Sequence, residues 1–215
     1  MKGQAGQPGA RAAKRIMVAS IALAVHATAA FGADEHAHHH HHGHAPAAAR
    51  QEATRSMAEY RLTPVKLVRA DGARVDFPAD IDDGRPVFVN FIYTTCTAIC
   101  PVMTQIFAAF EKQLGDEAPR VRLVSISIDP EQDTPTRLSA YAKQYSAGAE
   151  WSFYTGTVAN SVAVQKAFAA YRGDKMNHTP LTLIRPAPGK PWVRLDGFAT
   201  PDDLMKEYRA IADAK

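Results

Sequence analysis

The chain has 215 residues, 46% of them hydrophobic and 22% charged, which is an ordinary globular composition that provides for one sizeable core. It contains only two cysteines, so a small domain held together by several disulfides is excluded. The net charge of +3 comes from residues 1–33, because the rest of the chain has 21 basic and 22 acidic residues, and we therefore predict no nucleic-acid partner.

Residues 1–33 have the layout of a secretory signal peptide. A basic segment precedes an apolar run at residues 16–32, and Ala27–Ala29 matches an A-x-A cleavage site. The alternative is an uncleaved membrane anchor, although 17 apolar residues are short for a span. A lipoprotein is not expected, because the first cysteine is Cys96. We expect an exported protein in the periplasm, whose membrane contact would come only from an uncleaved leader.

Residues 34–60 are rich in histidine and alanine. This composition cannot build a core, so we predict a flexible linker. Closely spaced imidazoles bind copper, nickel or zinc loosely. We interpret the tract as a metal-collecting arm; the alternative, an expression tag, would be expected at a terminus. The histidines are His36, His38, His39, His40, His41, His42 and His44.

Residues 61–215 carry the pattern of one folded domain. Hydrophobic periodicity, turn residues and helix caps predict alternating strands and helices. Strands are expected at residues 65–67, 75–77, 87–93, 121–128, 151–154, 181–184 and 192–195. Helices are expected at residues 101–114, 135–145 and 158–171, and from residue 201 onward. The order predicts an α/β fold with a mainly parallel central sheet, an added N-terminal β-hairpin and an antiparallel edge.

The sharpest local motif is the cysteine pair in Cys96-Thr97-Ala98-Ile99-Cys100-Pro101. It follows a buried strand, and ligands bind at the carboxyl ends of such strands. Pro101 at a helix start places both sulfurs near the first turn, where unpaired N–H groups stabilise thiolates. Thiolates favour Cu(I), with zinc as a rival. The alternative is a structural disulfide, which would stabilise little across so short a loop.

His178 is the only histidine in residues 45–215. It precedes Pro180 and a predicted strand that can lie beside the cysteine strand. Cys96, Cys100 and His178 would then form a three-ligand site with an open position, which suits a metal that is passed on. The alternative is a surface histidine. A proline directly before such a strand is typical of thioredoxins, where its peptide bond is commonly cis.

Three segments together resemble the Sco/SenC family of copper-binding thioredoxin-like proteins: VNFIYTTCTAICP, ISIDPEQDTP and NHTPLTLI. The resemblance covers about residues 62–212. It implies a thioredoxin-like three-layer sandwich in which Cys96, Cys100 and His178 bind copper, as Cu(I) or Cu(II). It also implies delivery to a respiratory copper enzyme, with subunit II of cytochrome c oxidase as the expected acceptor and a separate copper donor protein. Asp129 matches a family aspartate near the site; the alternative is a turn residue that caps the next segment.

Two functions therefore remain open. In the first, the protein is a metallochaperone and not an enzyme. In the second, it is a thiol–disulfide oxidoreductase that reduces the cysteines of the target copper site: Cys96 attacks, Cys100 resolves the mixed disulfide, and His178 only modulates a pKa. Met103 and Met176 are auxiliary soft donors by type, although methionine is more often a core residue.

Overall fold

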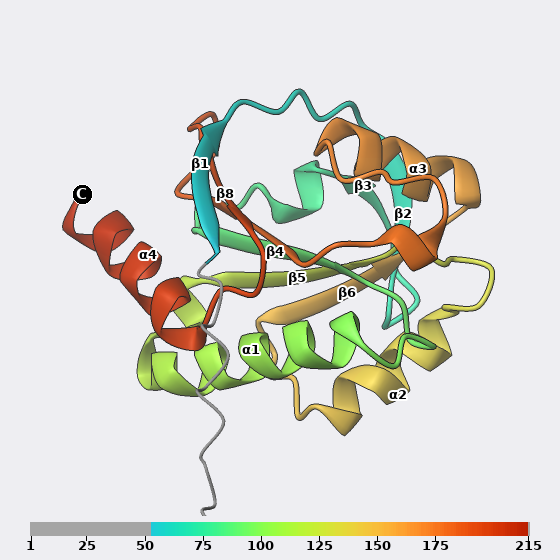
Figure 1. Cartoon of the computed structure of the whole chain (residues 1–215), viewed down its shortest axis with the longest axis horizontal. Helices are drawn as coiled ribbons and strands as arrows, with labels where there is room; N and C mark the ends of the chain where they lie inside the picture. Colours follow the sequence, from blue (N-terminus) through green and yellow to red (C-terminus); the bar gives the residue numbers. More distant parts are fainter. Residues whose placement is uncertain (1–52, 215) are drawn as a thin grey trace, which may run out of the picture. The chain divides into compact units, whose positions relative to one another are not determined.

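The computed structural model describes residues 53–214, which form one eight-stranded sheet with helices on both faces (Figure 1). The predicted leader and the histidine tract lie outside the described residues. The strands are β1 (Thr54–Ala58), β2 (Val65–Arg69), β3 (Arg74–Phe77), β4 (Val87–Ile92), β5 (Arg122–Ser127), β6 (Trp151–Thr155), β7 (Leu181–Arg185) and β8 (Trp192–Asp196). The helices are α1 (Ile99–Leu114), α2 (Pro135–Gln144), α3 (Val158–Ala167) and α4 (Pro201–Asp213), with short 3-10 turns η1 (Ala79–Ile81), η2 (Gly115–Arg120) and η3 (Lys175–Asn177).

The central strands of the sheet are parallel, and the strands towards both edges are antiparallel. Its strand order is β1-β8-β7-β4-β5-β6-β2-β3, and only the β4–β5 and β5–β6 pairings are parallel. The predicted sheet was mainly parallel, so this detail is corrected. Parallel neighbours need a helical crossover, which α1 and α2 provide, whereas the short β2–β3 and β7–β8 connections make hairpins.

The sheet also begins earlier than the composition indicates. Strand β1 lies inside the range predicted as a flexible linker, and it pairs with β8 from Thr54 opposite Asp196 to Ala58 opposite Trp192. Four of its five residues are exposed, so no apolar alternation marks it in the sequence. Backbone pairing at the sheet edge orders this segment, and the linker prediction is therefore wrong for residues 54–58.

Two packed layers hold the sheet. Helices α1, α2 and α4 cover one face, and α3 with η1 covers the other (Figure 1). On the α1 side, Phe88 packs against Phe110 of that helix with the ring centroids 4.7 Å apart and the ring planes tilted by 43°. On the other face, Phe168 lies edge-on to Phe91 and Trp192 at 6.0 and 5.0 Å. Each fully buried aromatic ring contributes about 1.5–3 kcal/mol, so both layers fix the position of β4.

The helix ends follow the predicted caps. Thr134 precedes Pro135 and caps α2, and Thr200 with Asp203 forms a capping box at the start of α4. Helix α3 ends at Ala167, four residues before its predicted end, and Phe168 turns into the core. Among residues 53–214, none of the helices has the length and apolar character needed to cross a membrane.

Candidate metal centre

The site is built at the carboxyl end of β4. All six residues of this strand are buried, because helices cover both faces of the sheet. After Ile92 the chain turns, and the Cys96 backbone N–H donates to the Tyr93 carbonyl at 3.1 Å. Helix α1 then begins at Ile99, two residues before the predicted start, and Ala98 provides no side-chain cap. Instead, the Cys100 N–H donates to Cys96 Sγ at 3.3 Å, so the sulfur occupies the helix N-terminus as predicted.

The two sulfurs have opposite environments. Cys96 is partly exposed, and Cys100 is buried. Partial burial raises the pKa of Cys96, but the backbone N–H groups of Cys100 and Ala98 outweigh it, and the net pKa is lowered. Burial raises the pKa of Cys100 strongly, and its Sγ accepts from the Tyr93 N–H at 3.4 Å. Cys96 is therefore the more acidic thiol of the pair, and Cys100 is the less acidic one.

His178 lies directly after η3 and before β7, which pairs with β4 as predicted. Its ring is 8% exposed, and its Nε2 lies 3.0 Å from the Phe91 carbonyl oxygen. A carbonyl only accepts hydrogen bonds, so Nε2 carries the proton and Nδ1 carries the lone pair. Burial lowers the pKa of His178, repulsion from Arg172 lowers it further, and the Phe91 bond opposes both. The imidazole is therefore neutral near pH 7, as a metal ligand must be.

His178 and Cys100 both bind backbone groups on the same side of strand β4, the side that faces β7. The Ile92 carbonyl accepts from Ile128 on the β5 side, so the Phe91 carbonyl and the Tyr93 N–H point the other way, towards β7. His178 binds the first of these groups and Cys100 Sγ binds the second. Even so, within residues 53–214 no three Cys, His, Asp or Glu side chains are gathered closely enough to hold a metal ion as they stand. The structure thus places the predicted ligands at one strand end without closing them into a site.

The peptide bond before Pro180 differs from the thioredoxin pattern. In the described part of the chain the only cis peptide is Phe77–Pro78, so the Thr179–Pro180 bond is trans. Met103 is buried in α1 and is a core residue, whereas Met176 lies on the surface beside Tyr93.

Asp129 lies in the loop after β5 and is buried against the turn that leads to His178. Its Oδ2 accepts from Lys175 Nζ at 2.5 Å, and its backbone N–H donates to Ser127 Oγ at 3.0 Å. Both interpretations of this residue thus have a basis in the structure, because Asp129 shapes its own turn and also binds η3. Among the described residues, no hydrogen bond joins Asp129 to Cys96 or Cys100.

Two residues of the site were not singled out by the sequence. Asp133 is fully buried and accepts from the backbone and the hydroxyl of Thr94, at 3.1 and 2.5 Å, and from Ser127 Oγ at 2.6 Å. It thereby fixes the loop before Cys96. Tyr93 is the second: burial, followed by a hydrogen bond to Cys96, raises its pKa to about 12. In the sequence, Tyr93 could have been found as the last residue of the predicted buried strand, and Asp133 as the second aspartate of the segment DPEQD at residues 129–133.

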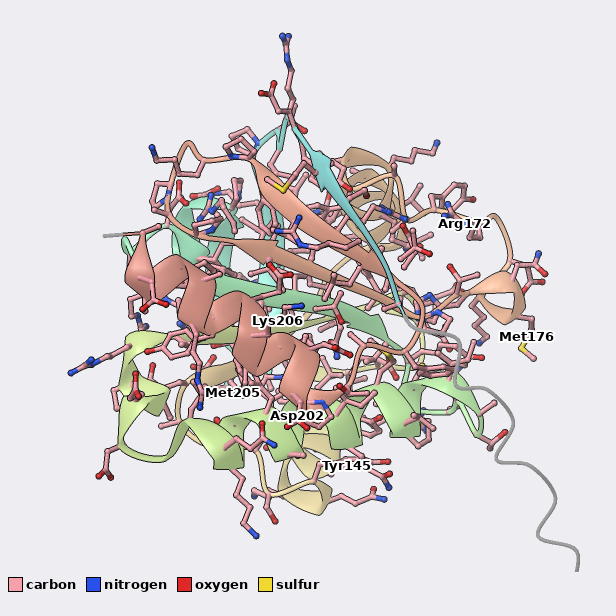
Figure 2. All side chains as sticks on the ribbon, turned by 60° about the vertical axis from the view of Figure 1, so that its left-hand side comes forward. Tyr145, Arg172, Met176, Asp202, Met205 and Lys206 are labelled. Carbon is pink, nitrogen blue, oxygen red and sulfur yellow. The ribbon has the colours of Figure 1, made fainter. Side chains whose placement is uncertain are left out.

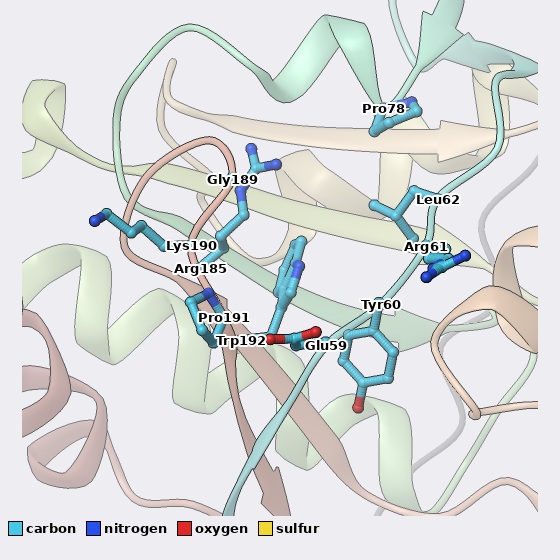
Figure 3. Close-up of a pocket in the computed structure, with 10 residues that line it drawn as sticks. All are labelled: Glu59, Tyr60, Arg61, Leu62, Pro78, Arg185, Gly189, Lys190, Pro191 and Trp192. Atoms are coloured by element: carbon cyan, nitrogen blue, oxygen red, sulfur yellow. The ribbon is translucent and has the colours of Figure 1, made fainter.

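A separate cavity of about 480 Å³ lies at the other end of the sheet. Figure 3 shows its walls, with Tyr60 on one side, Lys190 on the other, and Trp192 and Arg185 between them. Arg185 pairs with the first residue of β4, whereas Cys96 follows the last residue of that strand. The cavity contains no cysteine or histidine in its lining, so it is not part of the predicted metal site.

Comparisons with known proteins identify the family of the chain. The SCO1/SenC family model matches residues 52–213. A SCO1 protein homolog of Bacillus subtilis is 35% identical over 98 residues, which are 45% of this chain and 50% of that protein. The chain thus spans about half the length of this curated relative.

Solved structures extend the likeness to the fold. BsSco, described as a member of the Sco family of cytochrome c oxidase assembly proteins with a disulfide switch, is 27% identical with a TM-score of 0.62, covering 74% of this chain and 98% of that one. ScoI of Bradyrhizobium japonicum, solved with copper bound, is 22% identical with a TM-score of 0.59, covering 69% of this chain and 98% of that one, and it shares the fold. The fold is the thioredoxin-like α/β fold of these proteins. With a match over three quarters of its length, this chain belongs to the SCO1/SenC family.

Proposed function

We propose that the chain binds one copper ion through Cys96, Cys100 and His178 and delivers it to a respiratory copper enzyme such as cytochrome c oxidase. One observation carries the proposal: His178 and Cys100 bind successive backbone groups on one edge of β4, and Cys96 lies against the same helix start. Relatives crystallised with copper, such as ScoI of Bradyrhizobium japonicum, support it.

The donor set suits Cu(I). Thiolates are soft ligands, and a neutral imidazole completes the set. The Phe91 carbonyl holds His178 in the tautomer whose Nδ1 carries the lone pair, which is how backbone acceptors usually support metal-binding histidines. Three protein ligands leave a position for a ligand of the acceptor protein, so copper can leave by exchange. A movement of the Cys96 loop or of η3 would have to bring the donors together, because they are not gathered around one point in the described residues.

The cellular setting is proposed on the same basis. We place the protein in the periplasm after export by residues 1–33, either free or tethered by that segment. Subunit II of cytochrome c oxidase is the proposed acceptor, a copper donor protein supplies the metal, and the histidines of residues 36–44 collect copper loosely. The description of BsSco as a cytochrome c oxidase assembly protein supports this acceptor.

A second candidate is reduction of a disulfide in the target. Cys96 is partly exposed and its pKa is lowered, whereas Cys100 is buried and its pKa is raised, which is the asymmetry of an attacking and a resolving cysteine. Cys96 thiolate attacks one target sulfur and releases the other as a thiolate. Cys100 then loses its proton, attacks Cys96 Sγ and releases the second target thiolate. Two electrons pass to the target, and a Cys96–Cys100 disulfide remains.

Competition for Cu(I) against a chromogenic chelator tests the chaperone. The full chain is used with His36, His38, His39, His40, His41, His42 and His44 replaced by alanine, which removes the loose sites. We expect one tightly bound Cu(I) per chain. His178→Ala is expected to weaken binding by at least the roughly 10–100-fold that follows loss of a group supporting a metal site.

The matched control for the histidine is Lys166→Ala, an exposed side chain on α3 away from the cysteines. If His178→Ala binds Cu(I) as tightly as Lys166→Ala does, the histidine is not a ligand and the oxidoreductase is favoured. If turnover of a model disulfide is also absent in the reduced protein, neither function stands.

A further inference from the structure

Arg185 is a buried cation beside the cavity at the other end of the sheet. It ends β7 and is 5% exposed, although arginine is seldom buried in proteins. Three contacts account for part of its placement. The guanidinium forms an ion pair with Asp82, its Nη2 donates to the Ile81 carbonyl at 3.3 Å, and its central carbon lies 5.2 Å from the centroid of the Trp192 ring.

One donor of Arg185 has no acceptor. Its Nε is buried, and no atom of residues 53–214 accepts a hydrogen bond from it. A buried N–H that loses water and gains no protein partner costs free energy, so such groups are rare in folded proteins. Arg185 lines the cavity of about 480 Å³, which has room for a molecule that supplies the acceptor. A guanidinium only donates, so the group that satisfies Nε must accept.

The aromatic walls of the cavity are held in place by their neighbours. Trp192 is buried, and its ring lies edge-on to Tyr60 and Phe168, at 6.2 and 5.0 Å between centroids. The Tyr60 hydroxyl accepts from Arg194 at 3.1 Å, which fixes the tyrosine ring. Figure 3 shows Trp192 beside the Arg185 side chain, with Tyr60 across from them. Walls that are already fixed lower the entropic cost of binding a ligand.

The charge of the lining favours an anion. Among the described residues that line the cavity, the acidic side chain is Glu59, and the basic side chains are Arg61, Arg185 and Lys190. Asp82 offsets the charge of Arg185, and Glu59 offsets that of one further cation, so one positive charge is in excess. A carboxylate brings both the negative charge and the acceptor oxygens, and its planar shape matches a guanidinium.

We propose that this cavity binds a small organic carboxylate, one oxygen of which accepts from Arg185 Nε while its body lies against Trp192 and Tyr60. The volume of about 480 Å³ is within the range of pockets that hold small molecules. The site is separate from the candidate metal centre, because Arg185 ends β7, whereas Met176 and His178 precede that strand. Figure 2 shows Met176 at the rim of the molecule. The five residues of β7, at about 3.3 Å each, separate the two sites.

The test follows the indole N–H signals of the reduced, metal-free full chain in ¹H–¹⁵N spectra. The chain has two tryptophans, and Trp151 is the internal control, because it packs on the opposite face of the sheet from Trp192. Benzoate is expected to shift the Trp192 signal with half-saturation below about 1 mM, and to leave Trp151 unchanged. Benzamide, which has the same shape without the charge, should bind at least about tenfold more weakly. Inorganic phosphate, an anion without a planar body, should also bind more weakly than benzoate.

The absence of a saturable shift at Trp192 would overturn the proposal, because Nε would then be left to water. Equal shifts at Trp151 would also overturn it, since they would show binding elsewhere. Benzamide as tight as benzoate would show that the cavity does not read the charge. Phosphate as tight as benzoate would show a general anion site and not a carboxylate site.

Two variants locate the bound carboxylate. Arg185→Lys keeps the charge and removes the Nε donor, so benzoate binding should weaken about tenfold or more. Because a replacement at a buried position can destabilise the fold, a second variant changes only exposed residues: Arg61→Gln with Lys190→Gln should weaken binding about two- to fivefold. The matched control is Arg74→Gln with Lys166→Gln, which removes the same charge from exposed positions outside the lining. Equal affinity of the two double variants for benzoate would overturn the assignment.

Discussion

Asp133→Asn is expected to loosen the loop that carries Cys96. The carboxylate is fully buried and accepts from the N–H and hydroxyl of Thr94 and from Ser127 Oγ. A hydrogen bond to a charged group contributes about 1.5–3 kcal/mol. Asparagine retains one acceptor oxygen but places an NH₂ group where Oδ2 accepts from Ser127. The free energy of unfolding should therefore fall by about 2 kcal/mol, which is roughly 30-fold in the folding equilibrium.

Urea unfolding of the reduced, metal-free protein, followed by tryptophan fluorescence, measures this change. The midpoint should fall while the m-value stays constant, because the surface exposed on unfolding does not change. The matched control is Asp76→Asn, whose exposed ion pair with Lys66 is expected to contribute less than about 1 kcal/mol. Thr94→Val completes a double-mutant cycle with Asp133→Asn and should show coupling of about 0.5–3 kcal/mol. Equal stability of the two asparagine variants, or no coupling to Thr94, would refute the argument.

Three further outcomes are expected. Cys96 should reach half its maximal alkylation rate at a lower pH in the folded protein than in the urea-unfolded protein, because its pKa is lowered, while Cys100 stays unmodified in the folded protein; mass spectrometry after a pH series decides, and earlier modification of Cys100 contradicts it. Cu(I) binding at pH 7 should release at least one proton per metal, because burial keeps Cys100 protonated before copper binds, and calorimetry in buffers of different ionisation enthalpy measures this; no release contradicts a Cys100 ligand. Lys175→Met should lower the urea midpoint more than Lys166→Met does, because it leaves the buried Asp129 without its cation; equal midpoints would show that the pair holds nothing.

Elements marked by local signals were predicted well. The continuous apolar run at residues 87–93 predicts a buried strand, and the Thr-Pro pairs predict the starts of α2 and α4. The structure confirms these elements. Strand β1 could not be found in this way, because its side chains are exposed and only its pairing with β8 orders it. The extent of the parallel sheet was overestimated for a related reason: strand direction depends on connections across the fold.

The candidate site was predictable in composition but not in detail. The cysteine spacing and the lone histidine of the domain point to three ligands, and the strand pairing of β4 with β7 accounts for their proximity. The hydrogen bond from His178 to Phe91 joins residues 87 positions apart, so no local pattern contains it. Asp133 likewise acts through Thr94, 39 positions away. Both contacts arise from packing, which a single sequence does not display.

The burial of the donors implies an order in which copper would leave. Cys100 and His178 are buried and tied to the backbone of β4, whereas Cys96 is partly exposed. If copper is held by these residues as proposed, an incoming ligand of an acceptor would reach it from the Cys96 side. Loss of the proposed Cys96 bond would release a thiolate that the N–H groups at the start of α1 stabilise, so this bond would be less costly to break than the one to Cys100. Loss of Cys100 first would leave a charged sulfur in a buried position, where burial strongly disfavours the thiolate.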